Sequence, residues 1–500
     1  MKTKLWILFI GIFLFGSCLD DEGNYVYSDL NPIEIDSTEI LDSYRVTQFD
    51  YLVIDPAVKQ GKDDSNLTYE WRIFQTNPLP NPEIGRVVND VVGTERRLNY
   101  KVQTPVGNYK LSLKVFDKQN GVFETILRDL TIESFAPVGL MVMHGDADST
   151  DVSILVNNRI VPDATKDKVQ HNIFSQTNGH RIAGAPGMVR FTWGGPSIYV
   201  CTHGSEGGCL AKASNLGYAR SYAEMFDPVL NHEDIDFQAC ISKGSSIWMI
   251  NDGVIYRATN ESSFVSFGVP VFGEPYYAEP YIATETHGNY GGVFYDRLQK
   301  RFLYCHYTGV VAKFKEAGAS AIFDMNHVGE DMLFADRGFE NKWLCVMHNP
   351  ENQEKYSVYE CNLKNADDGN CGVGKYDISD CFAIEEANAF AFGKHNYLLY
   401  YALDTEIRMC NFKTQNTSIV RYTLPDNLLQ EGYKINLLYL YDVDGDNFGK
   451  NLYVGIYNPT TGEGKLLECP IIITDGEIMV DQIKTYDGFK KITHLSYKNQ

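Results

Sequence analysis

The chain has 500 residues, with 44 Lys and Arg against 65 Asp and Glu, a formal net charge of −21 at pH 7. At about 100–200 residues per domain, this length suits two to four domains, or one small domain and a large β domain. Aromatic residues form 13% of the sequence, which excludes a disordered chain. Nucleic acid is excluded as a partner because phosphate binding needs a basic face, and no Lys/Arg cluster supplies one.

The N-terminus is typical of a lipoprotein signal peptide. Lys2 and Lys4 precede an unbroken apolar run at residues 5–15. This run is shorter than the roughly 20 residues that span a bilayer and suits a signal sequence. Two small residues then precede Cys18, as lipoprotein signal peptidase requires. We predict that residues 1–17 are removed and that Cys18 is acylated. An ordinary signal peptide with an incidental cysteine is the alternative.

An acidic tether is expected at residues 18–29. Asp20, Asp21 and Glu22 directly follow the predicted lipidated cysteine. This arrangement resembles the surface-export signal of Bacteroidetes lipoproteins. The resemblance implies an outer-membrane protein that is lipid-anchored and faces the extracellular medium. An anchor that faces the periplasm is the alternative.

A β-sandwich is predicted for residues 30–135. Residues 67–73 alternate between apolar and polar side chains around Trp71, which we expect to pack between two sheets. A glycine turn, Tyr109 and further alternation at residues 107–115 are typical of a late sandwich strand with its corner tyrosine. Both features resemble a PKD- or immunoglobulin-like module. The Trp-Asp-Phe-Gly-Asp-Gly turn of the PKD family is absent.

A larger all-β domain is predicted for residues 139–500. Short apolar runs recur about 50 residues apart, most followed by a polar turn and a partner strand, as in the blades of a β-propeller. We predict about seven blades, with six or eight as alternatives, and expect residues 492–497 to complete the first blade. An irregular β-solenoid or a second pair of sandwiches is the rival fold. The runs lie at residues 140–143, 197–201, 246–250, 301–306, 342–347, 396–401 and 451–456.

The cysteines are expected to be mostly buried free thiols. The chain has 11, of which ten besides Cys18 lie in the second domain, mostly within apolar strands and with no Cys-x-x-Cys pair. An oxidising compartment also permits disulfides between sequence neighbours. The pairs close enough in sequence are Cys201 with Cys209, Cys345 with Cys361, and Cys371 with Cys381.

A calcium site is considered at Asp442, Asp444 and Asp446. These alternating carboxylates lie on a glycine-turned loop, and Ca²⁺ takes six to eight oxygen ligands. The loop departs from the EF-hand pattern because Asn447 and Tyr453 stand where that pattern needs glycine and glutamate. Any bound calcium is expected to be structural. An acidic surface turn is the alternative, since Asp, Asn and Gly are preferred turn residues.

Exposed aromatic side chains are the candidate ligand-binding residues. Tyr276, Tyr277, Tyr281 and Tyr290 lie in or near a proline-broken segment that we expect to be a loop. Trp193 marks a second aromatic tip. Flat aromatic rings on loops stack on sugars or pack against peptides. The alternative is that these rings pack between blades.

No catalytic residue is predicted. The glycine-rich run that begins at His203 lacks the first glycine of a nucleophile elbow and the helix that must follow it. Carboxylate pairs for glycoside hydrolysis stay possible in an acidic β protein, although no polar set can be assigned to inner strands.

Taken together, the lipidation site, the acidic tether, Tyr69 with Trp71, and the strand at residues 139–142 resemble the PKD-like family lipoproteins of gut Bacteroidetes. That resemblance implies a non-catalytic accessory subunit of a SusC/SusD-type nutrient-uptake complex. Its partners would be a TonB-dependent transporter, the lid lipoprotein of that transporter, and a peptide or glycan ligand. A surface-anchored propeller glycosidase or lyase is one alternative, and a purely structural subunit is another.

Overall fold

The computed structural model describes residues 32–499 except 39, 60–64, 82–83, 193–196, 228–234, 244–245, 260–266, 269–270, 285–289, 307–308 and 365–368. The chain divides into two compact units, Met1–Glu133 and Ser134–Gln500. Cys18, Asp20, Asp21 and Glu22 lie outside the described residues. Within the described part of the chain, no helix has the length and apolar character needed to cross a membrane.

The first unit is built from one large sheet and two small ones. The five-stranded sheet has the order β2 (Ser43–Thr47), β9 (Phe123–Glu133), β8 (Gly107–Asp117), β5 (Leu67–Phe74) and β6 (Asn89–Gly93). The small sheets pair β3 (Tyr51–Ile54) with β7 (Leu98–Lys101), and β1 (Glu34–Asp36) with β4 (Ala57–Lys59). Only β2 and β9 run parallel; the other named pairs are antiparallel.

One hydrophobic core joins these sheets, and the two predicted signature residues lie in it. Trp71 is 2% exposed, and its indole N–H donates to the carbonyl of Glu95 over 3.0 Å. The hydroxyl of Tyr109 donates to the carbonyl of Pro105, four residues earlier, over 2.8 Å. Tyr109 is therefore a corner tyrosine, as the sequence predicted, and Trp71 packs between the sheets.

The second unit contains seven small antiparallel sheets in its described residues. Two short α-helices, α2 (Ile173–Asn178) and α3 (Asp426–Glu431), accompany them, as do the 3-10 turns Ala223–Met225, Phe339–Asn341, Ile384–Glu386 and Val480–Gln482. The sheets are β36 (Lys491–Lys498), β10 (Gly139–Gly145), β11 (Ser149–Val156), β12 (Lys168–Gln170) and β13 (Ile182–Ala183); β14 (Ala185–Thr192), β15 (Ser197–His203), β16 (Gly208–Lys212) and β17 (Tyr218–Ser221); β18 (Phe237–Lys243), β19 (Ser246–Asn251) and β20 (Val254–Thr259); β21 (Tyr290–Asp296), β22 (Arg301–His306) and β23 (Val311–Lys313); β24 (Asp331–Arg337), β25 (Trp343–His348), β26 (Tyr356–Cys361) and β27 (Gly372–Asp377); β28 (Ala389–Phe392), β29 (Leu398–Ala402), β30 (Glu406–Asn411) and β31 (Ile419–Thr423); and β32 (Lys434–Leu440), β33 (Asn451–Tyr457), β34 (Gly464–Pro470) and β35 (Lys484–Phe489).

The strand next to the innermost one is the most deeply buried strand in most of these sheets. Every residue of β10, β19 and β29 is buried. Such a strand is covered on both faces, so its sequence is a continuous apolar run rather than an alternating one. The seven runs found in the sequence lie on β10, β15, β19, β22, β25, β29 and β33, one in each sheet. The prediction of an all-β protein is confirmed.

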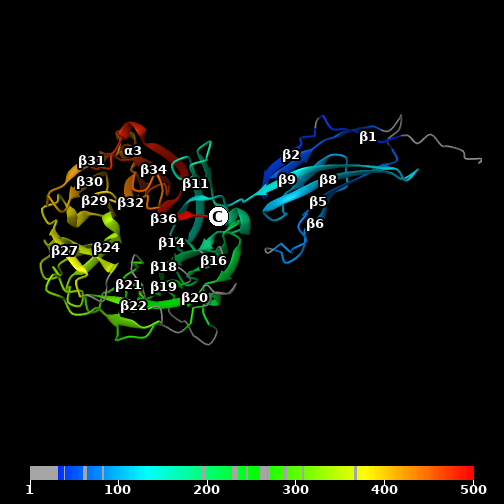
Figure 1. Cartoon of the computed structure of the whole chain (residues 1–500). Coiled ribbons are helices and arrows are strands. Elements are labelled where there is room, and N and C mark those ends of the chain that lie inside the picture. The colour runs from blue at the N-terminus through cyan, green and yellow to red at the C-terminus, as the bar shows by residue number, and fades with distance from the viewer. Residues whose placement is uncertain are drawn as a thin grey trace, which may run out of the picture. The chain divides into compact units, whose positions relative to one another are not determined.

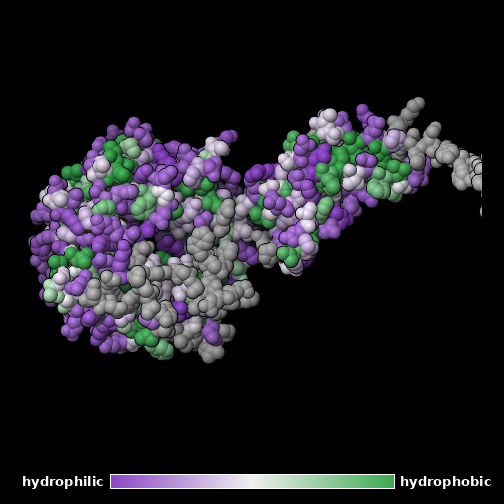
Figure 2. Space-filling view, in the orientation of Figure 1, coloured by the Kyte–Doolittle hydropathy of each residue, from purple (hydrophilic) through white to green (hydrophobic). Residues whose placement is uncertain are grey.

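The sheets are arranged around a common centre (Figure 1). β36 pairs with β10, with Tyr497 opposite Leu140, so the run at residues 492–497 completes the first sheet as expected. β36 also contacts β14 and β32, the innermost strands of the second and seventh sheets. No individual sheet closes on itself within the described residues. The face seen in Figure 2 is mostly hydrophilic, with a hollow near the middle of this unit.

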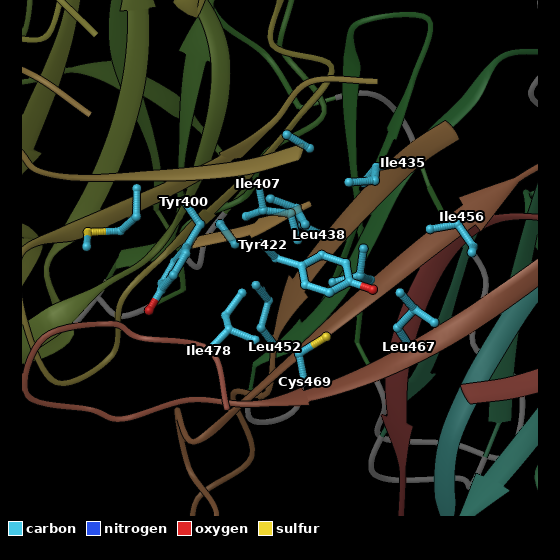
Figure 3. Packing of buried hydrophobic residues seen from close by; sticks show 14 of the residues in the cluster. Tyr400, Ile407, Tyr422, Ile435, Leu438, Leu452, Ile456, Leu467, Cys469 and Ile478 are labelled. Atoms are coloured by element: carbon cyan, nitrogen blue, oxygen red, sulfur yellow. The ribbon is translucent and has the colours of Figure 1, made fainter. Parts of the chain in front are cut away.

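Hydrophobic layers between neighbouring sheets hold this unit together. Figure 3 shows the layer between the sixth and seventh sheets, where Tyr400 and Ile407 belong to one buried cluster with Leu452 and Leu467. Burial of each such side chain contributes about 1.5–3 kcal/mol, so each layer is a substantial source of stability. The cysteines join these interiors: the ten from Cys201 to Cys469 are all buried and free. The thiols lose hydration there, which raises the pKa of Cys209 to about 12.

A buried polar cluster joins the first sheet to the seventh. The Glu468 cluster consists of Asn157, Arg159, Tyr453, Glu468 and Tyr486. The Glu468 carboxylate is fully buried and accepts hydrogen bonds from the Tyr453 hydroxyl at 3.1 Å and the Tyr486 hydroxyl at 2.8 Å. The Asn157 amide donates to the same carboxylate over 3.0 Å, and Arg159 lies 3.7 Å from it. Since Asn157 follows β11, the cluster ties the two ends of the ring together.

Candidate functional site

A cavity of about 770 Å³ lies where the innermost strands of the second unit converge. Its lining comes from β14, β18, β24, β28, β32 and β36, with additional residues from β15 and β25. Residues 280–284 supply the inner edge of the fourth sheet, since Ala283 pairs with Val293 of β21. All seven sheets therefore contribute to one wall. Its volume is within the range of about 300–1,000 Å³ usual for small-molecule sites.

Asp336 and Lys394 form a neutralised pair at the wall. The side chain of Lys394 is 0% exposed, and its ammonium group donates to Asp336 Oδ2 over 2.7 Å. It also donates to the backbone carbonyl of Arg337. These contacts offset the cost of burying a lysine charge, which would otherwise be several kcal/mol. Lys394 thus holds the end of β24 in place.

A second group connects Tyr439, Asp442 and Arg337. The Tyr439 hydroxyl donates to Asp442 Oδ1 over 2.5 Å, and Arg337 donates to the Asp442 backbone carbonyl over 2.6 Å. Burial, together with the neighbouring Asp442 charge, holds the pKa of Tyr439 well above its usual range. Tyr439 is therefore a protonated donor at every physiological pH. The Arg337 guanidinium also lies over the Phe448 ring at 5.1 Å.

His494 is a neutral imidazole on the cavity wall. Burial, followed by the nearby Arg190 charge, lowers the pKa of His494 to about 3. Its Nδ1 accepts a hydrogen bond from the Val189 backbone N–H over 3.4 Å, so the ring proton resides on Nε2. The imidazole can thus donate a hydrogen bond from Nε2.

Arg190 differs from these groups because it has no internal partner among the described residues. It lies on β14 and lines the cavity. Its Nε is buried without a hydrogen-bond partner, and no carboxylate of the described residues comes within ion-pair distance. Asp236, near the same wall, instead lies 3.6 Å from His203, and both side chains are about half exposed.

Aromatic side chains form the apolar part of the wall. Trp343 and Phe390 line the cavity together with Tyr281 and Phe334. The Tyr281 and Phe334 rings meet edge to face with centroids 5.7 Å apart, while Phe334 stacks on Phe390 at 6.0 Å. Such rings offer flat surfaces to a ligand beside the polar groups.

Of the predicted aromatic ligand residues, Tyr281 lines the cavity, although its hydroxyl donates to the carbonyl of Leu333. The hydroxyl of Tyr276 donates to the Val271 carbonyl over 3.1 Å, and burial raises its pKa to about 12. The hydroxyl of Tyr277 donates to Asp252 over 3.2 Å. These two hydroxyls are occupied within the protein. The side chain of Tyr290 and the whole of Trp193 lie outside the described residues.

The three aspartates considered for calcium have different surroundings. Asp442 belongs to the cavity wall, whereas the Asp444 side chain is 91% exposed and lies 4.0 Å from Arg337. Asp446 is exposed. The described residues contain no group of three or more His, Cys, Asp or Glu side chains placed to hold a metal ion. The carboxylates present thus do not form a ready calcium site, and calcium binding stays a prediction.

A buried serine–histidine pair has the spacing of a nucleophile and base but the wrong protonation. His144 Nε2 lies 2.8 Å from Ser153 Oγ, and its Nδ1 accepts from the Lys490 backbone N–H over 3.3 Å. The proton is therefore on Nε2, which donates to the serine instead of accepting from it. Burial lowers the pKa of His144 to about 3. This pair joins β10 to β11 and is structural.

The sequence analysis did not identify Arg190, Asp336, Tyr439 or His494 as site residues. Each lies on an innermost strand that mixes apolar and polar side chains, so the sequence pattern did not set it apart. Three of them come together only because β14, β32 and β36 meet across the ring.

Residues 18–186 match the sequence model of the PKD-like family. The N-terminal part of the chain is PKD-like. The match covers the first unit from Cys18 onward and the first strands of the second. No curated protein matches the chain.

Several solved structures share only a loose likeness with this chain. A quinonprotein alcohol dehydrogenase-like protein from Bacteroides thetaiotaomicron has 12% identity and a TM-score of 0.47, covering 93% of this chain and 99% of its own. AztD from Citrobacter koseri has 8% identity and a TM-score of 0.38, covering 87% and 99%. A DUF4784 family protein from Bacteroides caccae has 8% identity and a TM-score of 0.29, covering 94% and 99%. Likenesses at these scores carry no conclusion about activity.

Proposed function

We propose that the protein is a non-catalytic binding subunit of a SusC/SusD-type TonB-dependent uptake complex, anchored in the outer membrane and exposed to the medium. The observation that carries the binding role is the cavity to which all seven sheets contribute. Its wall combines flat aromatic rings with fixed hydrogen-bond donors, a combination that suits a peptide or a glycan. The match to the PKD-like family and the signal-like N-terminus support the location.

We further propose that the second unit is a seven-bladed β-propeller. Seven successive small antiparallel sheets, the contacts among their innermost strands, and the pairing of β36 with β10 support this architecture. In a propeller, radial repetition protects the sheet edges and leaves a channel at the centre, where the cavity lies.

The anchoring step rests on Cys18 and on the acidic residues Asp20, Asp21 and Glu22. A lipid holds the protein beside the transporter, which raises the effective concentration of captured ligand at the transporter mouth. Cys18→Ala should release the protein from the membrane fraction. Replacement of the three acidic residues by Asn or Gln should keep it in that fraction but protect it from protease added to intact cells.

The experiment that tests the accessory role is a mild-detergent purification of the tagged full chain from native outer membrane. Mass spectrometry of the co-purified proteins should find a TonB-dependent transporter and its lid lipoprotein in stoichiometric amounts. A protein that purifies alone would contradict the accessory role.

A second candidate function is a glycan-active enzyme, a glycosidase or a lyase. The specific observation in its favour is that the carboxylates of Asp336 and Asp442 line the same cavity as Tyr439 and His494. Paired carboxylates serve as acid and base in glycoside hydrolysis. Turnover of an oligosaccharide by the purified protein, abolished by Asp442→Asn, would establish the enzyme and replace the binding role.

A further inference from the structure

The cavity distributes its charges unevenly. Asp336 is paired with Lys394, Asp442 accepts a hydrogen bond from the Tyr439 hydroxyl, and Asp236 lies beside His203. The carboxylates of the wall are thus each accompanied by a group of the protein. Arg190 is the cation of the wall that has no such companion among the described residues.

An unpaired guanidinium is costly where water is restricted. Removing a charge from water costs several kcal/mol unless an opposite charge or hydrogen bonds replace the lost hydration. Arg190 is partly buried as a residue, and its Nε is fully buried and donates no hydrogen bond to the described residues. A carboxylate offsets this desolvation cost because its two oxygens can accept two parallel N–H···O hydrogen bonds from the guanidinium group.

A neutral hydrogen-bond donor, His494, lies beside Arg190. The Val189 N–H bond to His494 fixes β14 against β36, so that the imidazole and the guanidinium are neighbours, and Nε2 of the imidazole carries a proton. Tyr439 lies in the same wall, with its hydroxyl proton donated to Asp442. A neutral imidazole donor adds a hydrogen bond to an oxyanion without adding a second charge to be buried.

We propose that Arg190 is the specificity-determining residue of the cavity and that it binds a carboxylate of the ligand. This inference rests on the proposed binding function and names its ligand class, which is acidic. A uronate sugar and the C-terminus of a peptide both supply this chemistry. The cavity volume of about 770 Å³ favours a short oligomer or one end of a longer chain.

Isothermal titration calorimetry of the purified full chain in detergent tests the proposal. The probes are trigalacturonate with its methyl ester, and trialanine with its C-terminal amide, so that each acid has a neutral partner of the same size. We expect one acid to bind at least about tenfold more tightly than its neutral partner, equivalent to about 1.4 kcal/mol. Whichever acid binds identifies the source of the carboxylate.

Arg190→Gln should remove this preference. The affinity for the acid should fall about tenfold or more, while the affinity for its neutral partner should stay the same. Arg190→Lys should recover part of it, since lysine keeps the charge but not the fork. Arg408→Gln is the matched control: Arg408 pairs with Glu406 and lies over Phe382, away from the cavity, so its loss should not alter binding.

Equal binding of acid and neutral partner, or an acid preference that survives Arg190→Gln, would overturn the inference while leaving the binding function intact. Absence of binding by both acids at millimolar concentration would also overturn it. Failure of the proposed accessory function appears separately, as a protein that purifies without a transporter.

Discussion

The second unit contains two polar clusters that differ in how fully their central buried charge is hydrogen-bonded. In both, one guanidinium nitrogen is buried without a hydrogen-bond partner among the described residues: Arg159 Nη1 beside Glu468, and Arg190 Nε at the cavity. In the Glu468 cluster the buried carboxylate has donors from Asn157, Tyr453 and Tyr486, all within the fold. In the cavity, Arg190 has a buried Nε without a partner among the described residues. A buried carboxylate whose donors all come from the fold fixes one conformation, whereas a charge without such partners can bind a group from outside. The first should therefore govern stability and the second binding.

The largest effect on stability is expected from Glu468→Ala. The substitution leaves buried hydroxyl, amide and guanidinium groups without their carboxylate, and we expect a loss of about 3–5 kcal/mol in the free energy of unfolding of the second unit. Urea unfolding followed by fluorescence measures it. Glu477→Ala, at an exposed position, is the control and should change stability by less than about 0.5 kcal/mol. A loss no larger than that of the control would show that the ring does not depend on this cluster.

An acid-dependent loss is expected next, from His144. The pKa of His144 is about 3 in the folded protein and about 6.5 when unfolded, so between these values the unfolded state binds more protons. Stability therefore falls as the pH falls below 6.5, by up to about 1.4 kcal/mol per pH unit, or about 2 kcal/mol at pH 5. The difference in unfolding free energy between wild type and His144→Gln, measured at pH 7.5 and 5.0, isolates this contribution. A difference that does not vary with pH would contradict it.

Two tyrosines offer a matched pair for the comparison. Each donates to a carboxylate, Tyr453 to the buried Glu468 and Tyr439 to Asp442 at the cavity. Tyr453→Phe should cost about 1.5–3 kcal/mol because the hydrogen bond to a buried charge is lost. Tyr439→Phe should cost less than about 1 kcal/mol, since Asp442 is only partly buried and water in the cavity can replace the hydroxyl. Equal losses would remove the distinction between the clusters.

Arg190→Gln should have the smallest effect on stability. No described group depends on Arg190 for a hydrogen bond, so we expect the free energy of unfolding to change by less than about 0.5 kcal/mol or to rise. Thermal unfolding of the ligand-free protein gives the answer. A loss above about 2 kcal/mol would identify Arg190 as a structural residue.

How well each strand could be predicted from the sequence depends on whether one or both of its faces are buried. The strands next to the innermost ones are buried on both faces, and their continuous apolar runs revealed all seven sheets from the sequence. In the first unit, Trp71 and Tyr109 carry local signals, and the Tyr109 hydroxyl bonds only four residues away. Features that depend on nearby residues were therefore accessible without a structure.

The cavity was not predicted because its residues are far apart in the chain. Val189 and His494, which join β14 to β36, are 305 residues apart. The innermost strands mix apolar and polar side chains, so the sequence pattern did not single out Arg190. The tyrosine-rich segment attracted attention through composition, yet the hydroxyls of Tyr276 and Tyr277 bond within the protein.

The pairing of β36 with β10 makes completion of the first sheet and assembly of the cavity a single event. The backbone N–H of Lys490, just before β36, donates a hydrogen bond to His144 of β10, 346 residues away in the chain. Because contacts between residues so distant in sequence form slowly, we expect β36 to dock late in folding. Until β36 docks, the edge of β10 is unpaired and apolar, so it can pair with another chain and cause aggregation. Because β36 also carries Thr493 and His494 into the cavity wall, a folding intermediate without it has no complete pocket. Ligand binding would accordingly report the moment at which β36 pairs with β10, and a ligand present during folding would favour the state in which β36 is docked.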